Sequence, residues 1–96
     1  MSDNEHISEI IFDEVLDITM ALQYHEQLNQ LLNDQKQITL NAEKIERIDG
    51  AGLQLIVAFV IAADKLNMKV TWTGVSEIFK KNANILGVTD ILELNS

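Results

Sequence analysis

The stretch that decides the fold is Ile45-Glu46-Arg47-Ile48-Asp49-Gly50-Ala51-Gly52-Leu53. Its first residues have strand character, and a strongly apolar segment with helical spacing follows the small residues at once. A turn at a helix N-terminus presents backbone N–H groups to its surroundings and often binds or carries phosphate. Here Gly50 has no hydroxyl group, and Glu46 and Asp49 place negative charge where an anion would sit.

Two strands and a helix are predicted upstream of this turn, followed by a third strand. Alternating apolar residues indicate the strands, and Tyr24 and Leu28 begin a helical apolar arc with Thr19 as the expected N-cap. The predicted elements are a strand over Ile7–Phe12, its hairpin partner over Val15–Ile18, a helix over Met20–Asn33 and a strand over Ile38–Leu40.

Downstream of the turn, helices and strands continue to alternate. Ser76 is the expected N-cap of the last long helix, and Gly87 lies where its C-terminal cap belongs. The predicted elements are a helix over Gly52–Leu66, a strand over Lys69–Thr73, a helix after Ser76, and an apolar tail over Val88–Leu94 that packs as a short strand or helical turn. This order predicts an α/β fold with a mixed sheet of about four strands and three helices mostly on one face.

The helix after the turn has apolar residues on both of its sides. Gln54, Asp64 and Lys65 mark the polar side, yet Val57, Ala58 and Ile61 lie there too. One interpretation is partial cover by a neighbouring helix. The other is a partner-docking face continuous with the Gly50 turn, in which case polar substitution of Val57 and Ile61 leaves the fold intact and abolishes partner capture.

Length and charge bound the class of protein. The 96 residues suggest a single domain, residues 1–96, with Met1–His6 as a flexible tail. A net charge of −8 argues against nucleic acid and anionic membrane surfaces as partners. The polar start does not resemble a signal peptide, and the apolar run Leu55–Ala63 is too short to span a membrane. We therefore expect a cytoplasmic protein without direct membrane insertion.

The sequence offers little catalytic chemistry. His6 and His25 are the only histidines, no cysteine is present, and His25 cannot share a helix face with the adjacent Glu26. No catalytic set, metal-ligand spacing or nucleotide-binding loop occurs, so neither an enzyme nor a cofactor or metal is expected. Trp72 is interpreted as a partly buried strand residue, although a lone tryptophan could also line a small-molecule pocket.

The element order and the Asp49–Leu53 motif resemble a STAS domain, the small domain of anti-sigma-factor antagonists and of sulphate-transporter tails. Asp49, Ala51, Gly52 and Leu53 match the family's motif, and residues 87–92 resemble its ending. Asn41 stands where an aspartate is usual. Gly50 stands where the phosphorylatable Ser or Thr is usual, so phosphorylation at that position is excluded.

The resemblance implies a non-enzymatic module of bacterial partner switching, of the anti-sigma-factor antagonist type. Such a module docks an anti-sigma factor with a kinase-like fold or another signalling protein. The alternatives are a STAS subunit of an ABC-type lipid-transport complex and a small-ligand sensor. The expected partner-binding residues are Asp49, Gly50, Ala51, Gly52, Gln54, Val57, Ala58 and Ile61. Two of them have structural interpretations as well: Asp49 as a helix cap, and Gly52 as a close helix–sheet contact.

Overall fold

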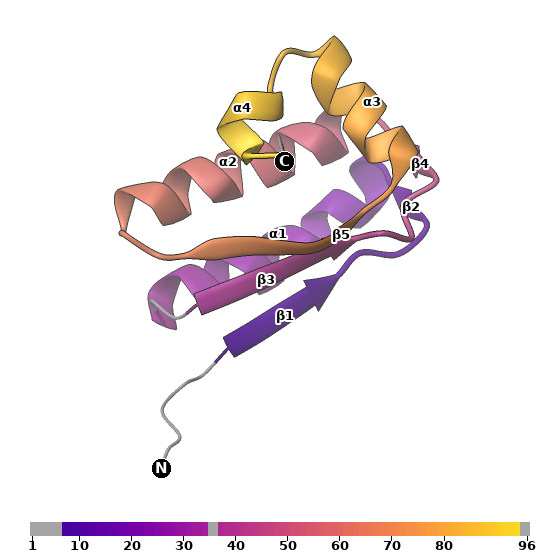
Figure 1. Cartoon of the computed structure of the whole chain (residues 1–96). Coiled ribbons are helices and arrows are strands. Elements are labelled where there is room, and N and C mark those ends of the chain that lie inside the picture. Colours follow the sequence, from indigo (N-terminus) through magenta and orange to yellow (C-terminus); the bar gives the residue numbers. More distant parts are fainter. Residues whose placement is uncertain (1–6, 35–36, 95–96) are drawn as a thin grey trace.

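The computed structural model describes residues 7–34 and 37–94, so the predicted tail Met1–His6 lies outside the described residues (Figure 1). Strands and helices alternate along most of the chain, as expected. The elements in chain order are β1 (Ile7–Ile11), β2 (Val15–Leu16), α1 (Ile18–Asp34), β3 (Gln37–Ala42), β4 (Arg47–Ile48), α2 (Gly50–Lys65), β5 (Val70–Val75), α3 (Glu77–Ile85) and α4 (Thr89–Leu92).

The described strands form two sheets, and all their pairings are parallel. β1, β3 and β5 make a three-stranded sheet with β3 at its centre, and β2 pairs with β4. The α/β class and the STAS-like arrangement are therefore confirmed. The predicted hairpin of Val15–Ile18 with the first strand is wrong, because Leu16 lies opposite Ile48 in a parallel pair and Ile18 already belongs to α1.

The helices cover one face of the three-stranded sheet (Figure 1). Ile38, Leu40 and Ala42 alternate along β3 and are buried, which places the core between this face and the helices. On the opposite face, the exposed hydroxyl of Thr73 donates a hydrogen bond of 3.2 Å to Glu9. Apart from the exposed Ile11, this sheet face is mostly polar, and no helix covers it among the described residues (Figure 1).

Local side-chain chemistry explains where the helices begin and end. Ser76 Oγ accepts the N–H of Phe79 at 3.1 Å, which confirms Ser76 as the N-cap of α3. Gly87 has φ of 71°, and the N–H groups of Gly87 and Val88 bond the carbonyls of Asn84 and Ala83, a Schellman C-cap.

The cap predicted for the first helix is wrong. Asp17 Oδ1 accepts the backbone N–H groups of Thr19 and Met20 at 3.1 and 3.2 Å, so Asp17 takes the capping role and Thr19 lies in the first turn of α1. The helix therefore begins at Ile18, two residues earlier than predicted, because the Asp17 carboxylate satisfies the N–H groups of its first turn with charge-assisted hydrogen bonds.

Candidate functional site

Asp49 joins the first turns of two helices. Its backbone is extended, with φ of −107° and ψ of −179°, and Oδ1 accepts the N–H of Gly52 at 2.9 Å. Its second oxygen, Oδ2, accepts the N–H of Ile18 at the start of α1 at 3.2 Å. The expected capping role is therefore present, and the same carboxylate also holds the start of α1 beside the start of α2.

Gly52 lets α2 approach strand β2 closely. A Cβ atom at Gly52 would collide with the carbonyl oxygen of Leu16 and lie 2.9 Å from Leu16 Cγ. Since the colliding atom belongs to the backbone, a side chain here could be accommodated only by moving β2 or α2. Gly52 is buried, and the close helix–sheet contact expected from the sequence is what the structure shows.

Gly50 has no such packing constraint. It is exposed, and a Cβ atom added there meets no heavy atom within 4 Å. The fold therefore has room for a serine or threonine at this position. The missing hydroxyl is a property of this sequence, and the backbone geometry of the turn does not demand it.

Some of the predicted docking residues on α2 are exposed to solvent, and others are half-buried. Gln54 and Ala58 are exposed, and Ile61 keeps 41% of its surface. Val57 is half-buried and packs against the core, and Ala51 is half-buried as well. Val57 is thus partly covered, as the first interpretation of the helix expects, while Ala58 and Ile61 leave an apolar strip open.

Two exposed apolar residues beside the turn were missed by the sequence reasoning. Ile18 and Leu22 keep 64% and 75% of their surface and lie one turn apart on α1. Their spacing of four, displaced from the arc of Tyr24 and Leu28, is the signal that could have found them. Because the backbone N–H of Ile18 is bonded to Asp49, the start of α1, which carries this pair, lies beside the α2 turn.

A shallow groove lies between α1 and α2, with Ala58 in its lining. It has a volume of about 210 Å³ and is lined by His25 and Asn29 from α1 and by Leu55 and Ala58 from α2, among others. We define the docking surface as the exposed residues at the start of α1 and along α2, of which Ala58 also lines the groove; its residues are Ile18, Leu22, Gly50, Gln54, Ala58 and Ile61.

Metal-binding clusters and membrane-spanning helices are both absent from the described residues. Residues 7–34 and 37–94 hold no cluster of three or more His, Asp or Glu side chains that could bind a metal. Within the same ranges, no helix is both long and apolar enough to cross a membrane.

Comparison with known proteins identifies the family. None of the curated proteins matches the chain. A family model does match it over residues 8–93, nearly the whole length, and its description is "Mlab, STAS domain". Together with the α/β architecture and the Asp49-capped turn, this match shows that the chain belongs to the STAS family, as a module of the kind associated with signalling or transport.

Proposed function

We propose that this chain is a non-enzymatic docking module of bacterial signalling in the cytoplasm, similar to the anti-sigma-factor antagonists. Its docking surface captures a protein partner, either an anti-sigma factor with a kinase-like fold or another signalling protein. The turn Asp49–Ala51 lies at one end of this surface, where Gly50 belongs to it, and Gln54, Ala58 and Ile61 continue it along α2.

The observation that carries the proposal is the exposed pair of Ile18 and Leu22 beside the Asp49 turn. Ile18 and Leu22 stay 64% and 75% exposed, so a partner that covers them gains the free energy of removing their apolar surface from water. Burial of apolar surface contributes about 25 cal/mol per Å², so two such side chains at the centre of an interface would supply a substantial part of its affinity.

Phosphate at Gly50 plays no part in the proposed function. In the family, phosphorylation adds about −1.5 to −2 charges to this loop and stops docking. Here the loop has no hydroxyl at Gly50, and both carboxylate oxygens of Asp49 accept backbone hydrogen bonds. The docking surface is therefore proposed to stay competent for binding without modification of this turn.

A second candidate is a STAS subunit of an ABC-type lipid-transport complex, in which the same surface would pack on the ATPase. It is favoured by the family match, because the family holds transport-associated as well as signalling modules. The two candidates differ in the partner and share the surface, so a single experiment can separate them.

The experiment places a photo-crosslinking amino acid at Leu22 in living cells and identifies the captured protein by mass spectrometry. Thr71, exposed on the polar face of the sheet, is the matched control position. We expect capture of a signalling protein from position 22 and not from position 71. Capture of an ATPase from position 22 would instead support the transport candidate.

Affinity measurements with the purified partner then test the surface itself. We expect Leu22→Ser to weaken binding by about tenfold or more, whereas Thr71→Ser leaves it unchanged. Equal crosslinking from both positions, or unchanged affinity of a folded Leu22→Ser variant, would contradict the proposed surface.

A further inference from the structure

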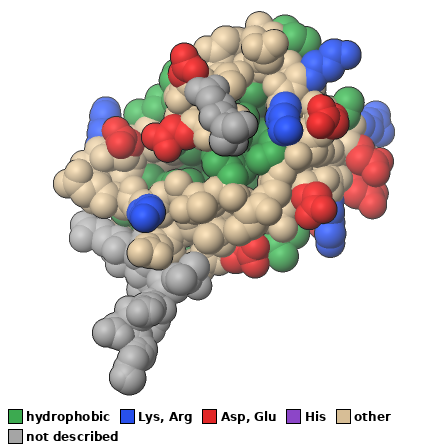
Figure 2. All heavy atoms as spheres, viewed as in Figure 1, with side chains coloured by type: hydrophobic (Ala, Val, Ile, Leu, Met, Phe, Trp, Pro, Cys, Tyr) green, Lys and Arg blue, Asp and Glu red, His purple; other side chains and the backbone are tan. Residues whose placement is uncertain are grey.

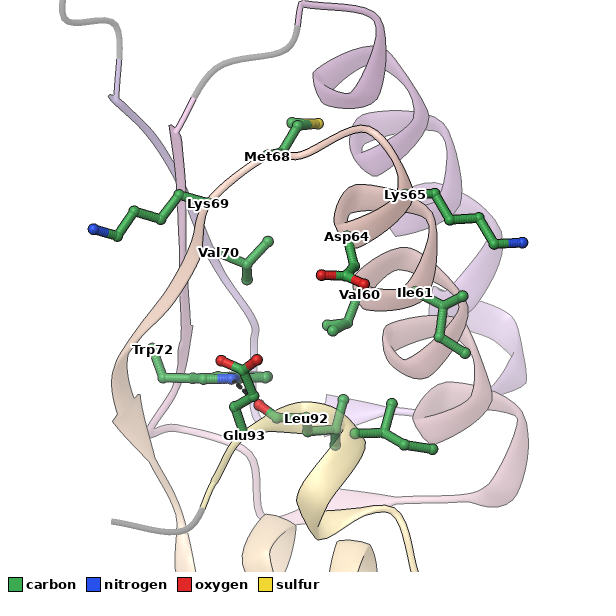
Figure 3. A pocket seen from close by; sticks show the side chains of 11 residues that line it. Val60, Ile61, Asp64, Lys65, Met68, Lys69, Val70, Trp72, Leu92 and Glu93 are labelled. Carbon is green, nitrogen blue, oxygen red and sulfur yellow. Dashed lines mark hydrogen bonds between the residues drawn. The ribbon is translucent and has the colours of Figure 1, made fainter.

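A cavity of about 530 Å³ lies between the C-terminal part of α2, strand β5 and α4. Figure 3 shows its walls: Val60 and Asp64 come from α2, Val70 and Trp72 from β5, and Glu93 from the end of α4. On the surface in Figure 2, hydrophobic side chains are visible in a hollow between the β5 and α4 segments. The volume is within the range of small-molecule sites, about 300–1,000 Å³.

The floor of the cavity is apolar and includes the face of an indole ring. Trp72 Nε1 donates a hydrogen bond of 2.8 Å to the carbonyl oxygen of Leu92, so the only polar atom of the ring is already satisfied. Phe79 packs on Trp72 with ring centroids 5.3 Å apart. Val70, Val60 and Met68 complete an apolar surface suited to a hydrocarbon group.

The charges that point into the cavity are carboxylates. In Figure 3, the carboxylates of Asp64 and Glu93 are directed into the space above Trp72, whereas the ammonium groups of Lys65 and Lys69 point away from it. Within residues 7–34 and 37–94, neither carboxylate side chain has a hydrogen-bond or ion-pair partner. The polar groups available to a ligand are thus two negative charges beside an aromatic face.

We propose that this cavity binds a small organic ammonium ion, an amine that carries an apolar or aromatic group. The indole face attracts a cation through its quadrupole, with tryptophan the strongest of the aromatic side chains. Asp64 and Glu93 add direct charge attraction, and the net charge of −8 raises the local concentration of cations. The apolar floor receives the hydrocarbon part of the same molecule.

Other ligand classes fit these walls less well. An anion would meet two carboxylates, and a bare metal ion would gain nothing from the apolar floor. A neutral apolar molecule would fit the floor but would gain no attraction from the carboxylates of Asp64 and Glu93. Ile61 of the docking surface also lines this cavity. The proposal does not depend on the docking function, because Asp64, Trp72 and Glu93, which would hold the ligand, lie outside the docking surface.

The test uses the fluorescence of Trp72, which is the only tryptophan in the chain and lines this cavity. Trp72 also borders a smaller pocket beside β5, and Asp64, which lines only the larger cavity, distinguishes the two. The full protein is titrated with phenethylamine, with the neutral phenethyl alcohol and with the anionic hydrocinnamate. We expect a saturable change for the amine, at concentrations about tenfold lower than any response to the other two.

Two substitutions remove the charges without changing the size of the side chains. Asp64→Asn and Glu93→Gln should each weaken phenethylamine binding several-fold, and together by about tenfold or more. Glu46→Gln, an exposed carboxylate before the Asp49 turn, removes the same charge elsewhere and should leave binding unchanged. Circular dichroism confirms that each variant is folded.

The proposal is overturned if the amine produces no saturable change in Trp72 fluorescence. Equal binding of all three compounds would also overturn it, as would amine binding that the folded double variant retains in full.

Discussion

Asp49 accepts the backbone N–H of Ile18 across 31 positions of the chain, at 3.2 Å. The same carboxylate caps α2 through Gly52, so one side chain fixes the relative position of two helix N-termini. Because Ile18 and Leu22 belong to one of these helices and Gly50 and Gln54 to the other, the bond also determines the shape of the docking surface.

Replacement of Asp49 by alanine should destabilise the protein. The variant loses the N-cap of α2, a contribution of about 0.5–2 kcal/mol, and leaves the N–H of Ile18 without its carboxylate partner. We expect Asp49→Ala to lower the free energy of unfolding in urea by about 1–2 kcal/mol. Glu46→Ala is the control, since this exposed carboxylate should change stability by less than about 0.5 kcal/mol. Equal stability of the two variants would contradict the bridging role.

The two glycines of the turn should respond in opposite directions to the same substitution. Gly52→Ala introduces a Cβ atom against the Leu16 carbonyl, and we expect a loss of about 1–3 kcal/mol despite the better helix propensity of alanine. Gly50→Ala meets no atom within 4 Å and should be neutral or stabilising by up to about 1 kcal/mol. Thermal unfolding of both variants measures the difference; a stable Gly52→Ala would show that the helix–strand contact is not tight.

A negative charge at Gly50 should separate folding from docking. Gly50→Asp places a carboxylate in the first turn of α2, where the helix dipole stabilises it by about 0.3–1 kcal/mol. On the proposed function, the same charge should weaken partner binding, as phosphate does elsewhere in the family. Gly50→Asn is the uncharged control of the same shape. Isothermal titration calorimetry with the purified partner that crosslinking has identified measures both affinities. Equal affinity of Gly50→Asp and Gly50→Asn would place Gly50 outside the interface.

Asp17 should contribute to the pH dependence of stability. The hydroxyl of Thr19, which donates to Oδ1 at 2.6 Å, and the backbone N–H of Met20 lower the pKa of Asp17 below its ordinary value of 3.8. A folded-state pKa below the unfolded one means that this stabilisation is present above the ordinary value and is lost as pH falls through the folded pKa.

We therefore expect Asp17→Asn to lose less stability than the unsubstituted protein when urea unfolding is followed from about pH 6 to about pH 2. Glu26→Gln, an exposed carboxylate on the same helix, is the control and should follow the unsubstituted protein. If Asp17→Asn follows it too, Asp17 does not account for the acid sensitivity.

The sequence predicted best what depends on neighbouring residues. Ser76 and Gly87 bound α3 as expected, because caps are local hydrogen-bond patterns. The strand β2 was assigned to the wrong partner because Val15 and Leu16 carry too little pattern to distinguish a hairpin from a parallel pair with β4, about thirty residues away. The pairing of β2 with β4 depends on contacts between residues far apart in the sequence, and the spacing of apolar residues within a segment does not reveal such contacts.

The same limit applies to the candidate site. The capping by Asp49 and the close approach of Gly52 to β2 could be predicted from neighbouring residues. The residues that α1 contributes to the docking surface could not. Ile18 was assigned to a strand, so its place beside Asp49 and the exposure of Leu22 could only be seen once α1 and α2 lay side by side. The cavity at Trp72 needed the folded chain too, since α2, β5 and α4 are separate in the sequence.

The turn at Gly50 has a consequence for how such a module would be controlled in a cell. Because Gly50 has no hydroxyl group, a kinase cannot phosphorylate this residue. On the proposed function, the fraction of partner captured then follows mass action and is set by the amounts of the two proteins. In the absence of modification at other residues, synthesis and turnover would control docking, and the response would have a threshold where one protein exceeds the other in number.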